Sequence, residues 1–152
     1  MTGRVALRAA LGLLVVSGLV VGCWAAFAPH SFFVSFPGGG HVWAGVDGPY
    51  NEHLVRDVGD LNLALAAVTA GAFVWLTRPL TIAAALAWVV YSVPHFAYHA
   101  ANTQVVTGGD RVPELASLAV PIVLGAALLL VARRAPTWAR AVSAGAPATA
   151  GG

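Results

Sequence analysis

Four apolar segments set the strongest constraint on this chain of 152 residues. They cover residues 5–28, 51–77, 80–100 and 114–132. An α-helix rises about 1.5 Å per residue, so about 20 apolar residues cross the hydrocarbon core of a bilayer. Only 9% of the residues are charged, against roughly 25% in soluble domains, so this composition cannot build a water-exposed surface. The sequence therefore predicts an all-α integral membrane four-helix bundle in residues 1–134 and a flexible cytoplasmic tail in residues 135–152.

The arginines are distributed unevenly between the two sides of the predicted bundle. Arg56 and Arg111 fall on one side, and the other six fall on the opposite side, at Arg4, Arg8, Arg78, Arg133, Arg134 and Arg140. Basic residues are enriched on the cytoplasmic side of membrane proteins. We therefore expect a multi-pass protein of the cell (cytoplasmic) membrane, with both termini in the cytoplasm. The arginines form no dense patch with aromatic residues, so nucleic acid is not an expected partner.

Polar residues gather at the outer ends of the second and third segments. Glu52, Arg56 and Asp60 are spaced by four, and so are His53 and Asp57, which places each set on one helix face. Asn51 is suited to cap this helix. The third segment adds a second polar face, and the whole predicted polar cluster is Glu52, His53, Arg56, Asp57, Asp60, Tyr91, His95, Tyr98, His99 and Asn102.

This polar cluster has three interpretations. A structural cluster would hold the helices together through hydrogen bonds and ion pairs. A metal or haem site would use His53, Asp57, His95 and His99, because the tight turn at Arg78-Pro79 makes the second and third segments antiparallel neighbours. Such a His and carboxylate set suits zinc, iron or copper. In the third interpretation, the acids beside Arg56 exchange protons in a small carrier. The sequence leaves the cofactor undetermined.

The segment from Pro29 to Tyr50 is long for a loop in so compact a chain. Its aromatic residues predict that it rests on the outer interface or folds over the mouth of the bundle. Gly38, Gly39 and Gly40 are expected to form a flexible point. The single cysteine, Cys23, excludes an intramolecular disulfide, and the sequence before it also fits a lipoprotein signal, so lipidation of Cys23 stays open.

The stretch "YNEHLVRDVGDLNLALA", followed later by "VPHFAYH", resembles small four-span membrane proteins of actinobacteria and, more loosely, the DoxX-like group. The resemblance implies a four-helix membrane fold and no particular reaction. No complete catalytic set is evident, so we do not expect an enzyme. The expected function is that of an accessory, assembly or interaction subunit, in contact with the lipid bilayer and with other membrane proteins or a second copy. The alternatives are a metal- or haem-binding redox protein and a small proton-coupled carrier.

Overall fold

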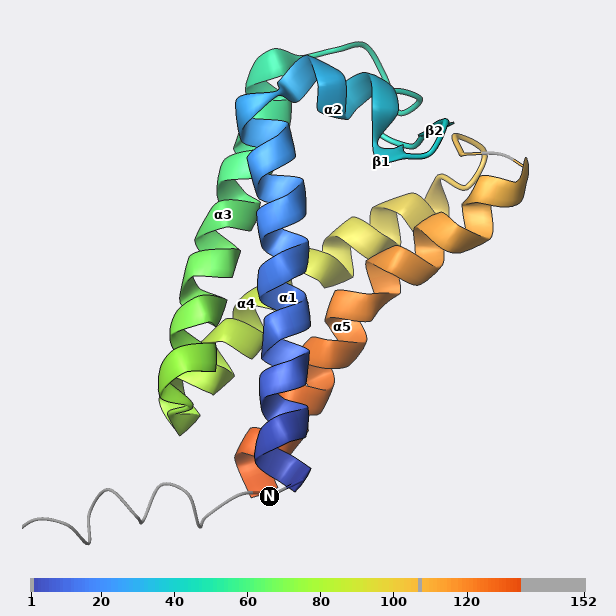
Figure 1. The fold of residues 1–152 in the computed structure, drawn as a ribbon. Coiled ribbons are helices and arrows are strands. Elements are labelled where there is room, and N and C mark those ends of the chain that lie inside the picture. The colour runs from blue at the N-terminus through green and yellow to red at the C-terminus, as the bar shows by residue number, and fades with distance from the viewer. Residues whose placement is uncertain (1, 107, 135–152) are drawn as a thin grey trace, which may run out of the picture.

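The computed structural model describes residues 2–106 and 108–134, and Figure 1 shows its fold. Four long helices in this part of the chain are apolar enough to cross a membrane. The elements in chain order are α1 (Thr2–Phe27), α2 (Pro29–Ser35), β1 (Pro37–Gly38), β2 (His41–Val42), α3 (Glu52–Trp75), α4 (Arg78–Ala101), η1 (Gly108–Asp110) and α5 (Arg111–Arg134). The four helices predicted from the sequence are confirmed, each within three residues of its expected ends. The predicted tail lies outside the described residues.

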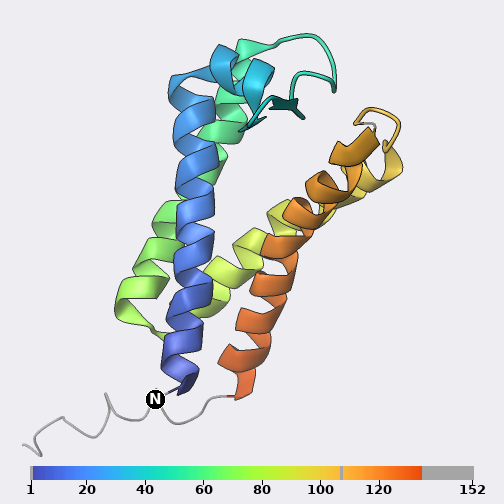
Figure 2. The same ribbon diagram turned by 45° about the vertical axis from the view of Figure 1, so that its right-hand side comes forward.

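The long helices form two pairs, α1 with α3 and α4 with α5. The pairs meet at one end and spread apart toward the other, as both ribbon views show (Figures 1 and 2). We call the end where the pairs meet the arginine end, because Arg4, Arg8, Arg78 and Arg133 lie near it. The opposite end, which carries α2 and both short strands, is called the polar end. The helix axes of the two pairs are therefore farthest apart at the polar end.

Close packing of α1 on α3 depends on glycine. Gly18 and Gly22 are four residues apart on α1, and Gly59 lies on the facing side of α3. A Cβ atom at Gly59 would lie 2.9 Å from the carbonyl carbon of Ala25, and one at Gly22 would lie 2.9 Å from the side chain of Leu63. Small residues at this spacing let two helix backbones approach closely in a membrane. The α1–α3 pair is therefore a tight unit.

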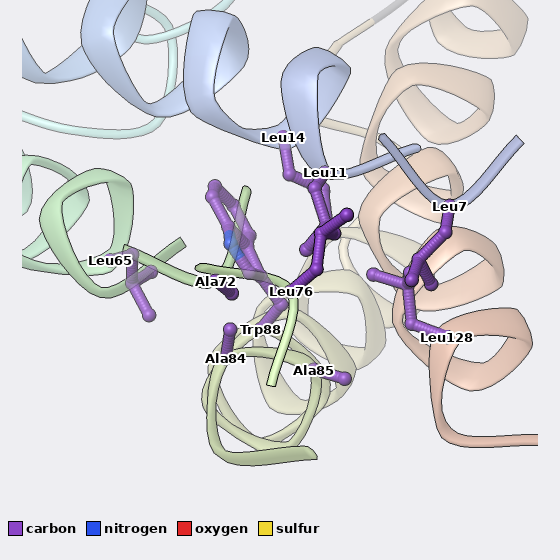
Figure 3. Packing of buried hydrophobic residues seen from close by; sticks show 10 residues of the cluster. All are labelled: Leu7, Leu11, Leu14, Leu65, Ala72, Leu76, Ala84, Ala85, Trp88 and Leu128. Carbon is purple, nitrogen blue, oxygen red and sulfur yellow. The ribbon is translucent and has the colours of Figure 1, made fainter. Parts of the chain in front are cut away.

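The hydrophobic core fills the half of the bundle nearer the arginine end (Figure 3). Its buried members are Leu7, Leu11, Leu14, Leu65, Ala72, Leu76, Ala84, Ala85, Trp88 and Leu128. Trp88 is only 2% exposed, and its indole Nε1 donates a 2.8 Å hydrogen bond to Thr69 Oγ1. This bond joins α3 to α4. Trp88 also borders the space between the helix pairs, so it separates the packed core from the polar end.

Residues visible in the sequence mark both ends of α3. The side chain of Asn51 accepts a 3.2 Å hydrogen bond from Leu54 N, which confirms Asn51 as the N-cap. At the other end Leu76 adopts a left-handed conformation, with φ of 50°, and α4 starts two residues later with Pro79 in its first turn. The predicted tight turn between these helices is present.

The segment expected as a long loop contains regular structure. Residues 29–35 form α2, and β1 pairs with β2 in an antiparallel hairpin whose partners are Pro37 with Val42 and Gly38 with His41. Gly39 and Gly40, at the turn, have φ of 66° and 87°. Glycine adopts these positive angles without steric cost, so the glycine run builds a tight hairpin turn. We call residues 29–50 the roof.

Candidate functional site: a roofed cavity between the helix pairs

A cavity of about 360 Å³ lies between the two helix pairs at the polar end. All four long helices and the roof contribute to its lining. Ser17 and Val21 come from α1, Leu54, Val58 and Asn62 from α3, Trp88, Ser92 and His95 from α4, and Glu114, Ser117 and Leu118 from α5. The cavity exists because the helix pairs diverge and the roof spans the gap between them.

The roof is held together by aromatic contacts. Trp24 at the end of α1 packs edge-on against Phe32 and Phe36, and Trp43 packs edge-on against Phe36. Tyr50 packs beside Phe33, and loss of contact with water, together with the Glu52 carboxylate, raises the pKa of its phenol. Of the two expected arrangements, the structure shows the one in which aromatic residues fold over the mouth of the bundle.

Two polar contacts attach the roof to the α4–α5 pair. The phenol of Tyr98 donates a 3.2 Å hydrogen bond to Asp47 Oδ1, and His41 Nδ1 lies 2.7 Å from Asp110 Oδ1. The roof is also continuous with α1 and α3 through the chain itself. These side-chain contacts therefore link the two helix pairs at the end where their ribbons are farthest apart (Figure 2).

A row of polar side chains crosses the cavity from α3 through α4 to α5. Asn62, which is 3% exposed, donates a 3.2 Å hydrogen bond to the phenol of Tyr91. The Tyr91 ring stacks on His95 with centroids 5.5 Å apart, and His95 packs edge-on against His99 at 4.8 Å. His99 Nδ1 lies 2.8 Å from Glu114 Oε1. We call these five residues the polar row.

Three polar atoms in the residues that line the cavity are buried and have no hydrogen-bond partner in the described part of the chain. They are Trp43 Nε1, Ser92 Oγ and Glu114 Oε1. Glu114 Oε1 nevertheless lies 2.8 Å from His99 Nδ1, a contact that is an ion pair when His99 is protonated. Most buried polar groups in proteins are paired, because an unpaired one costs about 1–3 kcal/mol. Their gathering around one cavity points to a binding role.

The structure separates the four residues expected to hold a metal. His95 and His99 line the cavity, whereas His53 and Asp57 form a 3.5 Å pair on the exposed face of α3. The side chain of His53 is 86% exposed. Within the described residues, no three His, Cys, Asp or Glu side chains are grouped closely enough to hold a metal ion. The expected convergence fails because His53 and Asp57 face away from α4.

Of the two neighbours that share its predicted helix face, Glu52 and Asp60, Arg56 contacts Glu52. Its guanidinium lies 2.9 Å from Glu52 Oε1, and its Nη1 donates a hydrogen bond to the backbone carbonyl of Ala26. Asp60 is exposed, and the described structure records no ion pair between it and Arg56. Asn102 caps the end of α4 by donating to the carbonyl of Tyr98. Arg56 and Asn102 are thus structural contacts at helix ends.

Sequence reasoning missed two members of the polar row, Asn62 and Glu114. Both carried a signal: each is a polar residue in or beside an apolar segment, where its burial requires a partner. Ser92 carried a weaker signal, because serine is common in membrane helices. Comparisons of the chain with models of known protein families, with curated proteins and with solved structures yield no match. The resemblance to DoxX-like proteins therefore stays a prediction.

Proposed function

We propose that this protein is a multi-pass protein of the cell membrane that binds a small, mainly apolar molecule in the roofed cavity. The cavity with its polar row is the observation that supports the proposal. The six arginines on one side favour an orientation with the arginine end in the cytoplasm. The cavity then opens in the outer half of the membrane. The accessory role expected from the sequence stays a prediction, compatible with ligand binding.

The volume and the lining of the cavity support a binding role over a purely structural one. Protein interiors are close-packed and contain few spaces much larger than a water molecule. Small-molecule sites have volumes of about 300–1,000 Å³, apolar linings and a few convergent polar groups. This cavity falls in that range and combines aromatic roof residues with the polar row on the opposite helices. The cavity, together with the unpaired Trp43 Nε1 and Ser92 Oγ of its lining, therefore supports binding over a purely structural cluster.

The proposal is tested by thermal unfolding of the purified protein in an uncharged detergent. The probes are three water-soluble benzyl compounds of different charge: benzyltrimethylammonium, N-benzylacetamide and benzylsulfonate. We expect at least one probe to raise the unfolding temperature, because a ligand that binds only the folded state stabilises it. The Val58→Trp substitution, which fills the cavity from α3, should abolish this rise.

Val74→Trp is the matched control, because Val74 lies on α3 outside the cavity and is 61% exposed. This variant should keep the full response. If no probe stabilises the protein, or if both variants respond as the unsubstituted protein does, the cavity is not a binding site.

A further inference from the structure

We infer that the cavity selects an organic cation, such as an amine or quaternary ammonium compound with an aromatic or branched apolar body. This inference rests on the proposed function and specifies the ligand of that site. It follows from three features of the residues that line the cavity: their charges, their aromatic rings and their unpaired polar atoms.

The charged residues of the lining are acids. Asp47, on the roof, is exposed at the edge of the cavity, and Glu114 lies deeper, on α5, with 4% exposure. No arginine or lysine lines the cavity in the described part of the chain. Arg56 is engaged by Glu52 and Ala26, and Arg111 is exposed outside the cavity. Apart from its histidines, the lining carries two acidic groups and no basic one, which favours a positively charged ligand.

Aromatic rings surround the same space. Phe32, Phe36 and Trp43 contribute from the roof, and Trp88 and Tyr91 contribute from α4. The face of an aromatic ring carries partial negative charge, so a desolvated cation over it gains about 2 kcal/mol or more. Recognition of quaternary ammonium groups commonly uses such rings. The lining thus offers an organic cation both apolar contact and electrostatic attraction.

The buried polar atoms of Glu114 and Ser92 add a further argument. Glu114 Oε1 has only the His99 ring as its close partner, and it lacks an aligned hydrogen bond. A buried carboxylate is stabilised by positive charge beside it, from a protonated histidine or from a bound cation. Ser92, which is 2% exposed, also has no partner for its hydroxyl. A bound cation beside Glu114 would supply such a positive charge. An amine group would also donate a hydrogen bond to Ser92 Oγ.

The absence of basic residues from the described lining also disfavours an anion. A phosphate, sulfonate or carboxylate ligand would lie beside Asp47 and Glu114 without a compensating arginine or lysine. Like charges in a site of low polarity repel strongly. A neutral ligand meets no such penalty, and it is therefore the competing outcome in the test.

The test compares the dissociation constants of the three benzyl probes by isothermal titration calorimetry in an uncharged detergent at neutral pH. We expect benzyltrimethylammonium to bind roughly tenfold or more tightly than N-benzylacetamide, which corresponds to about 1.4 kcal/mol. Benzylsulfonate should not bind. Equal affinity for the cation and the neutral amide would overturn the charge selectivity and leave the proposed function intact. Failure of all three probes would remove both proposals.

Two substitutions locate the charge that is responsible. Glu114→Gln keeps the shape of the side chain and removes its charge, so affinity for the cation should fall roughly tenfold while that for the amide stays unchanged. Asp47→Asn, on the roof and away from the helix core, should lower affinity for the cation by a smaller factor. It provides the test if the Glu114 variant does not fold. Asp57→Asn, on the exposed face of α3, is the matched control and should have no effect. Unchanged cation affinity in both cavity variants would overturn the inference.

Discussion

Arg56 of α3 donates a hydrogen bond to the backbone carbonyl of Ala26 in the last turn of α1. The last carbonyls of a helix have no partner within it and carry partial negative charge. Arg56 supplies both a donor and a positive charge at this position, and Glu52 holds the guanidinium in place. The contact therefore fastens the polar end of the α1–α3 pair, beside the point where the roof begins.

Removal of this contact should destabilise the protein. We expect Arg56→Gln to lower the free energy of unfolding in mild detergent by about 1–2 kcal/mol, because a charge-assisted hydrogen bond is lost. Arg111→Gln, at an exposed position on α5, is the control and should change it by less than about 0.5 kcal/mol. Equal effects of the two substitutions would contradict the capping role.

The contact between Gly59 and the α1 backbone predicts a second effect. We expect Gly59→Ala to cost about 1–3 kcal/mol, because the added methyl group collides with Ala25 and Ala26 and forces the helices apart. Gly109→Ala is the matched control, since a Cβ atom there meets open space. Thermal unfolding of both variants in the same detergent provides the measurement, and an unfolding temperature for Gly59→Ala equal to that of the control would refute the prediction.

The hydrogen bond from Trp88 to Thr69 predicts energetic coupling between α3 and α4. A double-mutant cycle of Trp88→Phe and Thr69→Val should give a coupling free energy of about 1 kcal/mol. The same cycle with Trp75→Phe in place of Trp88→Phe should give no coupling, because Trp75 is 69% exposed at the end of α3. Additive effects of Trp88→Phe and Thr69→Val would show that the bond contributes nothing to stability.

Affinity for an organic cation should depend on pH. His95 and His99 face the cavity together with Tyr91 from the same helix, Glu114 from α5 and Asp47 from the roof. Protonation adds positive charge at a histidine and removes negative charge at a carboxylate. Both changes oppose a cation, so the dissociation constant of benzyltrimethylammonium should rise as pH falls. Calorimetry at several pH values measures it, and tighter binding at acidic pH would contradict this sign.

The exposed pair of His53 and Asp57 should contribute little. We expect His53→Ala and Asp57→Asn each to change the free energy of unfolding by less than about 0.5 kcal/mol, because an exposed i, i+4 pair gains little. Chemical denaturation with far-ultraviolet circular dichroism provides the measurement. A decrease of more than about 2 kcal/mol in the free energy of unfolding of either variant would contradict this prediction.

The apolar segments and helix-end signals made the helices predictable. Length and composition determine where a chain can form membrane-crossing helices, and Asn51 and Pro79 mark where two of them begin. The aromatic residues after Pro29 also indicated a segment that folds over the bundle. These features depend on neighbours in the sequence, so they can be read without knowledge of the tertiary structure. Membrane insertion and the side on which each terminus lies stay predictions.

The candidate site depended on the rotation of each helix about its axis. Spacing showed that His53 lies on one face with Asp57, and His95 on one face with His99, but it did not show which faces meet. The contacts at Gly59 and Ala26 turn His53 outward, whereas the divergence of α4 and α5 from α1 and α3 opens the space beside His95. The sequence alone thus determined the helices and their polar ends. Only tertiary packing decided which residues share a cavity with the histidines of α4. These are Asn62 and Glu114, and not His53 and Asp57, because helix–helix contacts bring together side chains that are far apart in sequence.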